Sequence, residues 1–162
     1  MGTQRQFLRF QLQSNLMALM EIDLVTELVN IPSDRIVPMP HLPAAVMGIY
    51  NWRGEILWIV NLATLLGSSR PAGRSRSLQP TMILSGGATP EDRLQKTVGL
   101  VVDELDEIEW FDLDTIQSPV PANIYPEFSQ WANGLWISAT GENFLRLDGQ
   151  KILAGADFNA DV

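Results

Sequence analysis

The sequence of 162 residues contains no cysteine and a single histidine, His41. The absence of thiols excludes disulfides, thiolate nucleophiles and cysteine-type metal sites, and one imidazole leaves little beyond carboxylates to bind a transition metal. His41 lies in the proline-framed stretch P-M-P-H-L-P, and no nucleophile signature such as G-x-S-x-G accompanies it. We therefore interpret His41 as a solvated loop residue and expect neither a metal nor another cofactor.

Basic residues are also scarce, because eleven Lys and Arg stand against nineteen Asp and Glu, for a formal net charge of −8. This balance repels phosphate backbones and anionic lipid headgroups, so it disfavours nucleic acid and membrane surfaces as partners. Apolar runs such as 16–20 and 56–60 are far shorter than the roughly 20 residues that span a bilayer. No signal-peptide pattern follows Arg5 and Arg9. We expect a cytoplasmic protein without direct membrane insertion.

The sequence does contain many short apolar or alternating stretches, separated by prolines and glycines. A chain of this length favours one domain, and such strand spacing is typical of an all-β barrel or sandwich. Helical signals are brief: two turns over 23–30, one turn over 63–66 ended by Gly67, and one over 126–133 ended by Gly134. The predicted strands are 7–12, 16–22, 56–62, 81–85, 98–103, 136–140 and 144–147.

Residues 68–80, S-S-R-P-A-G-R-S-R-S-L-Q-P, divide the chain near its middle and predict a loop, because this composition cannot build a core. The two sides resemble each other. T-E-L-V-N-I at 26–31 shares Glu, Leu and Ile with D-E-L-D-E-I at 103–108, and V-N-L-A-T-L-L at 60–66 is similar to L-D-G-Q-K-I-L at 147–153. Both an internal duplication and chance recurrence explain these matches; a duplication would give two small barrels.

The stretch 103–114 carries seven carboxylates and no cation. It lacks the glycine and the closing glutamate of an EF-hand loop. Three interpretations stay open: a solvated acidic edge, a surface for a partner of complementary charge, or the carboxylates of a hydrolase.

Tryptophan and arginine, the side chains that interfaces favour, are the remaining candidates for function. Tryptophan also fills the cores of small β-barrels, and we expect at least three of the five to do so. Arg53 precedes Gly54 in N-W-R-G, where the backbone turns, so its guanidinium can cap strand-end carbonyls or reach a partner.

Six blocks, in order along residues 7–153, resemble the CheW family of chemotaxis coupling proteins. They are F-L-R-F-Q-L, V-T-E-L, I-V-P-M-P-H-L-P leading to M-G-I-Y-N-W-R-G, L-W-I-V-N-L-A-T-L-L-G, V-G-L-V-V-D-E-L-D-E-I and F-L-R-L-D-G-Q-K-I-L. The resemblance implies an all-β fold, in which two small five-stranded β-barrel subdomains pack side by side with a few short helices. We expect one CheW-like domain over 1–162, with approximate subdomains 15–80 and 81–147, the opening strand 7–13 packing with the second, and a short tail at 154–162.

The resemblance also implies a function. The expected protein is a non-enzymatic signal-transduction adaptor that couples the cytoplasmic hairpin tip of methyl-accepting chemoreceptors to the regulatory domain of a CheA-type histidine kinase. A β-barrel binding module for another peptide or a small molecule is the alternative, and a carboxylate-based hydrolase using residues 103–114 is the weaker one.

Site residues follow from the same blocks. Receptor contacts are implied for Arg53, Asn51, Val25, Glu27, Leu28 and Ile108, and kinase contacts for Trp58 and Asn61. The family usually has Leu where Trp52 stands, Pro where Trp58 stands and Asp where Asn61 stands. These departures indicate a partner set adjusted to a divergent receptor or kinase; flagellar and pilus-linked or phototaxis systems both stay open.

Overall fold

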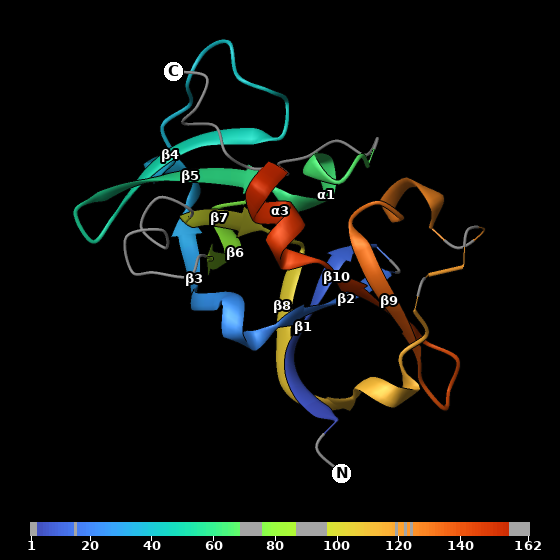
Figure 1. Cartoon of the computed structure of the whole chain (residues 1–162). Coiled ribbons are helices and arrows are strands. Elements are labelled where there is room, and N and C mark those ends of the chain that lie inside the picture. Colours follow the sequence, from blue (N-terminus) through green and yellow to red (C-terminus); the bar gives the residue numbers. More distant parts are fainter. Residues whose placement is uncertain are drawn as a thin grey trace.

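The computed structural model of the chain describes residues 3–14, 16–68, 76–86, 97–118, 120–121, 123 and 125–155. Within them, two five-stranded sheets pack together (Figure 1). Sheet A has the order β8-β1-β2-β10-β9, with β1 (Gln4–Gln13), β2 (Leu16–Glu21), β8 (Glu104–Asp112), β9 (Ala132–Ile137) and β10 (Asn143–Leu147). Sheet B has the order β3-β6-β7-β5-β4, with β3 (Val25–Pro32), β4 (Val46–Trp52), β5 (Glu55–Asn61), β6 (Leu78–Ser85) and β7 (Thr97–Val101).

The helices are short. They are the α-helices α1 (Leu62–Leu65) and α3 (Gly149–Gly155) and the 3-10 helices η1 (Ile22–Leu24), η2 (Ser33–Arg35), η3 (Leu113–Thr115) and η4 (Pro126–Phe128). The predicted all-β class is thereby confirmed. None of the helices in the described part of the chain combines the length and apolar character needed to cross a membrane.

The helix predicted over 23–30 is wrong. Only η1 forms there, and β3 follows it, because Val25, Glu27 and Val29 are more buried than Thr26 and Leu28 between them. That two-residue alternation, carried by β-branched side chains, suits a half-buried strand. The turn over 63–66 is confirmed as α1, and Gly67 ends it with a φ of 108°.

The two sheets repeat one arrangement. Each contains one parallel pair, β5 with β7 and β10 with β2. In each, a 3-10 helix follows one edge strand, and the next segment forms an isolated bridge to the other edge strand, Val37 to Ile49 in sheet B and Gln117 to Leu135 in sheet A. This repetition supports the internal duplication. The continuous ladders leave β3, β4, β8 and β9 as edges, so the sheets are not the closed barrels that were expected.

Strand pairing also corrects the register of the repeat. Leu28 lies opposite Met82 and Ile108 lies opposite Leu8, in equivalent places of β3 and β8. Leu28 therefore corresponds to Ile108, three residues away from the alignment that the shared letters suggest. The second pair of segments is aligned as predicted, because Asn61 and Asp148 directly precede α1 and α3.

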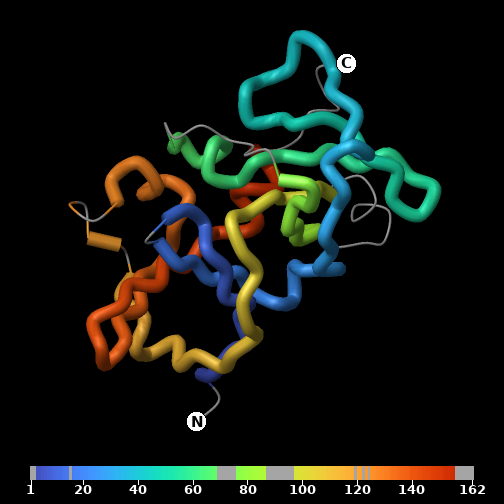
Figure 2. The backbone as a smooth tube through the Cα atoms, turned by 180° about the vertical axis from the view of Figure 1, so that it is seen from behind, coloured from blue at the N-terminus to red at the C-terminus, as the bar shows by residue number. Residues whose placement is uncertain are grey.

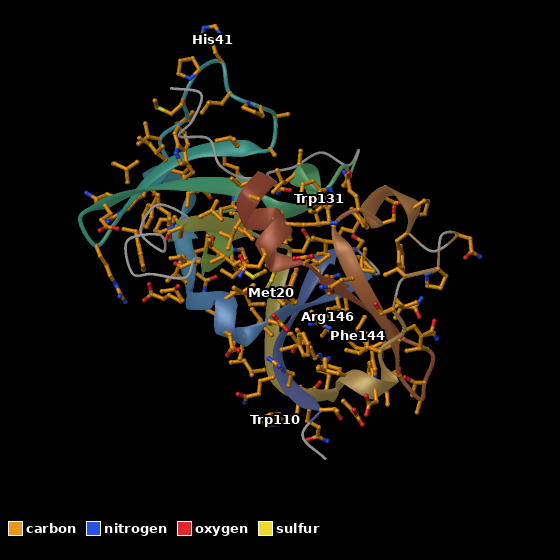
Figure 3. The ribbon with its side chains drawn as sticks, in the orientation of Figure 1. Met20, His41, Trp110, Trp131, Phe144 and Arg146 are labelled. Carbon is orange, nitrogen blue, oxygen red and sulfur yellow. The ribbon has the colours of Figure 1, made fainter. Side chains whose placement is uncertain are left out.

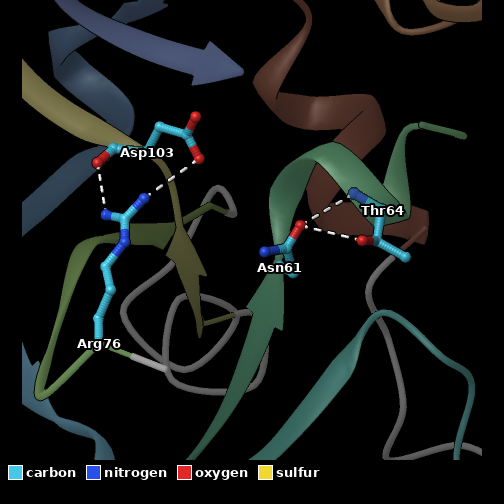
Figure 4. Close-up of polar contacts among 4 residues, drawn as sticks. All are labelled: Asn61, Thr64, Arg76 and Asp103. Atoms are coloured by element: carbon cyan, nitrogen blue, oxygen red, sulfur yellow. Dashed lines mark hydrogen bonds and ion pairs between the residues drawn. The ribbon is translucent and has the colours of Figure 1, made fainter. Parts of the chain in front are cut away.

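Sheet membership crosses the predicted division of the chain at 80 and 81. Strand β2 pairs with β1 in sheet A, while β6 and β7 pair with β3 and β5 in sheet B. The opening strand β1 lies in the same sheet as β8, β9 and β10. After β7 the chain passes to sheet A and runs along it to η3 at the far end (Figure 2). Arg76 ties this crossing, because its guanidinium donates to the Asp103 carbonyl at 2.6 Å (Figure 4).

Three apolar clusters hold the molecule together. The central one lies between the sheets and takes Leu8 and Phe10 from β1 and Met82 and Leu84 from β6. Sheet B encloses a cluster of Ile31, Ile36, Leu57, Ile59, Ile83 and Val101, and sheet A one of Phe7, Leu19, Phe111, Ile116 and Phe144. Among the tryptophans Trp58 is buried, and Trp52, Trp131 and Trp136 are partly buried and pack against the three clusters. This agrees with the expectation that at least three of the five fill cores.

Candidate partner-binding site

The turn between β4 and β5 places Arg53 at the tip of a hairpin. Arg53 and Gly54 have φ values of 51° and 82°, and a two-residue type I′ turn needs two such left-handed residues. The Asn51 side-chain oxygen accepts the Gly54 N–H at 3.0 Å, which closes the turn. The Arg53 side chain is 68% exposed, so the turn holds a cation in solvent.

Glu27 fixes the direction of that cation. Its carboxylate accepts one hydrogen bond from the Arg53 guanidinium at 2.8 Å and one from the Trp52 indole at 2.6 Å. The guanidinium carbon lies 5.1 Å from the centre of the Trp52 ring. Because Glu27 belongs to β3 and Trp52 to β4, the cluster joins the two edges of sheet B, which we call the sheet-B seam. The family's usual Leu at position 52 lacks the indole N–H that anchors Glu27 here.

The apolar residues predicted to bind the receptor lie outside this cluster. Val25 is half-buried and packs against the central core. Leu28 and Ile108 are 37% and 48% exposed. On β3, Leu28 points away from the interior of sheet B, to which Val29 and Ile31 contribute. On β8, Ile108 and Trp110 are exposed, whereas Phe111 belongs to the interior of sheet A. The structure therefore brings Arg53, Asn51 and Glu27 together and leaves Leu28 and Ile108 as separate exposed apolar positions.

The two residues predicted to contact the kinase make contacts within the protein. Trp58 is only 9% exposed and belongs to the central core. Asn61 is the N-cap of α1, because its side-chain oxygen accepts the backbone N–H and the hydroxyl of Thr64, both at 3.0 Å (Figure 4). Asp148 has the same task for α3, accepting the Lys151 N–H at 3.2 Å.

Two arginines in sheet A were missed by the sequence reasoning. Arg9 and Arg146 both lie opposite Leu19, on the strands either side of it. Arg9 donates to Glu109 at 2.9 Å and to Asp106 at 3.0 Å, and Arg146 donates to Glu21 at 2.8 Å. Each guanidinium also lies over a ring, Arg9 over Phe144 and Arg146 over Phe7, at 5.1 and 5.3 Å.

The pKa of the Arg9 guanidinium is held above its ordinary value, first by the hydrogen bond to Glu109 and then by the charges of Glu109 and Asp106, against the opposing effect of burial. The period-two alternation of Phe7 and Arg9 was a signal that could have placed Arg9 beside the sheet-A core.

The acidic stretch forms most of β8, an edge strand. Glu104, Asp106 and Glu107 are exposed along it. Asp112 accepts the Asp114 N–H and the Thr3 hydroxyl, and these bonds, the first more than the second, hold the pKa of its carboxyl below the ordinary range. The described residues hold no group of three or more side chains that could bind a metal ion. His41 is exposed on the loop that projects beyond β4, as its solvated-loop interpretation requires (Figure 3).

Comparison with known proteins identifies the family of the chain. A family model described as the CheW-like domain matches residues 6–157. The chain belongs to the CheW-like family. No curated protein matches this CheW-like chain significantly. Among solved structures, it is similar to the crystal structure of the scaffolding protein TtCheW from Thermoanaerobacter tengcongensis, with a TM-score of 0.70 and 21% identity over 89% of this chain and 88% of that one. At this identity the match shows a shared fold.

Membership of the CheW-like family places the protein among chemotaxis scaffolds that act by contact and not by catalysis. The prediction that the chain is not an enzyme is confirmed on that ground, and the hydrolase interpretation of residues 103–114 is set aside.

Proposed function

We propose that this protein is a cytoplasmic adaptor that joins the hairpin tip of a chemoreceptor to the regulatory domain of a CheA-type kinase. The observation that carries the proposal is the sheet-B seam, where a type I′ turn, a carboxylate and an indole hold the exposed Arg53 in one orientation. An exposed ion pair contributes at most about 1 kcal/mol to stability, so folding alone gives little reason for this construction. A fixed cation is useful for orienting a partner through charge-assisted hydrogen bonds.

The receptor tip would supply a pair of helices with an apolar ridge. Leu28 and Ile108 expose apolar surface on β3 and β8. Val25, which is half-buried, lies three residues before Leu28 on β3. Helices bind other proteins through such apolar positions, with charged contacts fixing the register. In this proposal Asn51 acts through the turn it closes, and Glu27 acts by orienting Arg53.

For the kinase, the burial of Trp58 and the capping bond of Asn61 favour an indirect role. Trp58 supports β5 from within, and Asn61 sets where α1 begins. We propose that the surface around the end of β5 and α1 contacts the kinase, and that these two residues position it.

A small-molecule binding module is less well supported. Ile59 and Ile83 inside sheet B are both fully buried. At Gly99, between them in the sheet, an added Cβ would come within 2.7 Å of Ile59. That interior is packed with side chains, which leaves no room in it for a ligand.

Calorimetric titration tests the proposal, with the kinase regulatory domain and a receptor-tip fragment as separate ligands. Both are expected to bind saturably. Arg53→Glu places a second carboxylate beside Glu27, and we expect it to weaken receptor binding at least about tenfold, equivalent to about 1.4 kcal/mol, while leaving kinase binding intact. Arg35→Glu, at another exposed arginine of the same half of the molecule, is the matched control and should change neither. Absence of binding to both ligands up to roughly 100 μM, a free energy weaker than about −5.5 kcal/mol, would contradict the adaptor function.

A further inference from the structure

The seam of sheet A, between its edge strands β8 and β9, is built differently from the sheet-B seam. Phe111 of β8 meets Trp136 of β9 edge to face, with ring centres 4.9 Å apart. The β9–β10 connection, S-A-T-G-E over 138–142, provides no cation comparable to Arg53. The sheet-A seam therefore has aromatic rings and carboxylates but lacks the guanidinium that completes the other seam.

A surface hollow of about 460 Å³ lies at this seam. Its lining comes from the end of β8, from η3 and from β9, and consists of Glu109, Trp110, Phe111, Asp112, Thr115 and Trp136. Trp136 forms a fixed wall, because its indole donates to the Thr115 hydroxyl at 3.1 Å and its ring meets Phe111. Trp110 is 62% exposed, next to the N-terminal end of the described chain (Figure 3).

An exposed indole of this size is costly to leave in water, and it does not contribute to any of the three apolar clusters. Isolated exposed apolar residues are common, but Ile108 and Ile137 are also exposed, at 48% and 44%, on the same two edge strands. An exposed indole in a hollow lined by polar groups, with further apolar residues exposed on the same strands, is typical of an interaction surface.

The charges around the hollow favour a positively charged ligand. Glu109 and Asp112 contribute carboxylates, and Asp112 Oδ1 accepts the Asp114 N–H and the Thr3 hydroxyl. Arg9 binds Glu109 from the interior side of the sheet. Arg5 is exposed on β1 opposite Phe111, but it lines the neighbouring hollow on the other side of Trp110. Indole faces attract cations, and carboxylates give them charge-assisted hydrogen bonds.

We propose that this hollow binds an arginine side chain presented by a protein partner. The guanidinium would stack on Trp110 and donate to Asp112, in the manner in which Arg53 stacks on Trp52 and donates to Glu27 within the chain. The inference does not depend on the proposed adaptor function, since the six residues that line the hollow include none implied for the receptor or the kinase, and Ile108, which is implied for the receptor, lies outside it.

The test uses the whole protein with 15N-labelled tryptophan, whose five indole N–H signals report on the hollow, through Trp110 and Trp136, and on three other places at once. The probe is N-acetyl-arginine amide, and the matched control is N-acetyl-citrulline amide, which has nearly the same shape without the charge. We expect saturable shifts of the Trp110 and Trp136 signals with the arginine probe, in the millimolar range, and none with the citrulline probe. Equal shifts with both probes, or shifts spread over all five indoles, would overturn the proposal.

Variants separate binding from general attraction to an acidic protein. Asp112→Asn keeps the oxygen that accepts from Thr3 and Asp114 but removes the charge, and Trp110→Ala removes an exposed ring whose loss should not affect folding. Each should weaken arginine binding at least about threefold. Glu104→Gln, an exposed carboxylate elsewhere on β8, should have no effect. Sedimentation velocity measures whether the chain self-associates. Self-association that Trp110→Ala abolishes would mean that a second copy of the chain occupies the hollow, and it would overturn the proposal.

Discussion

Sheets A and B have one topology, yet their interiors are filled by different chemistry. In sheet B, Ile59 and Ile83 lie on either side of Gly99. In sheet A, the equivalent places are held by Arg146 and Arg9, on either side of Leu19. Gly99 between two isoleucines in sheet B thus corresponds to Leu19 between two arginines in sheet A. The arginine side chains extend past Leu19 to the carboxylates that they bind.

The difference shows what a repeated fold must keep and what it may change. Both sheets keep the parallel pair, the helix cap and the bridge to the edge strand, which fix the backbone. The filling can vary, because dispersion and apolar burial stabilise one interior while paired charges over aromatic rings stabilise the other. We expect mutations to distinguish the two interiors by size of effect and by sensitivity to salt.

The largest effect is expected from truncating the apolar interior. Ile59→Ala should lower the free energy of unfolding by about 4 kcal/mol, because the side chain is fully buried and its loss leaves a cavity. Arg146→Ala, at the equivalent place in sheet A, should cost less than half as much, since that side chain is 20% exposed. Urea unfolding of both variants measures the difference. Ile56→Ala, at a 65% exposed position of the same strand as Ile59, is the control and should stay within about 0.5 kcal/mol of wild type. Equal losses at positions 59 and 146 would show that the arginine stem packs as tightly as isoleucine.

A smaller effect separates the two bulged edges. Gly48 and Gly134 have equivalent places in β4 and β9, opposite Ile59 and Arg146. A Cβ at Gly48, where φ is 148°, would lie 2.3 Å from the Val37 carbonyl oxygen, which accepts the Ile49 N–H. Gly48→Ala should therefore cost about 3 kcal/mol, by breaking the bridge and straining the backbone.

At Gly134 the Cβ would meet the Ile116 side chain at 2.5 Å, and a side chain can move aside where a backbone cannot. We expect Gly134→Ala to cost about 1 kcal/mol in the same unfolding assay. A larger loss at Gly134 than at Gly48 would mean that the sheet-A bridge, not the sheet-B bridge, is the rigid one.

Part of this comparison could be predicted from the sequence, and part of it depends on contacts between distant residues. Local alternation predicted β1, β2 and β5, and the echo of 60–66 in 147–153 aligned the two helix caps correctly. The helical interpretation of 23–30 was wrong, because Val25, Leu28 and Val29 also fit one face of a helix, and the pairing of β3 with β6 selects the strand. Which strands share a sheet depends on contacts distant in sequence, which no local pattern encodes.

The site divides in the same way. The N-W-R-G turn could be predicted because Gly54 suits a left-handed position and the Asn51 side chain can accept a backbone N–H of the turn, and Arg53 lies at its tip. Its partner Glu27 was named from the family resemblance, but the role of Trp52 as a second donor to that carboxylate emerges only when β3 and β4 approach each other. The exposure of Trp110 also depends on the edge position of β8, which the composition of the acidic stretch does not reveal.

The smallest effect tests the charged interior directly. Arg9→Met keeps an unbranched apolar stem beside Phe144 and removes the guanidinium, leaving Glu109 and Asp106, which are 41% and 36% exposed, to water. The expected cost is about 1 kcal/mol at low ionic strength, because partly exposed ion pairs contribute little. In 1 M NaCl the Debye length falls to about 3 Å, and the cost should fall by about half. Ile83→Met is the equivalent substitution in sheet B, where no charge is lost, and its cost should not decrease with salt. If both variants responded to salt alike, the two interiors would not differ in the electrostatic way that the arginines indicate.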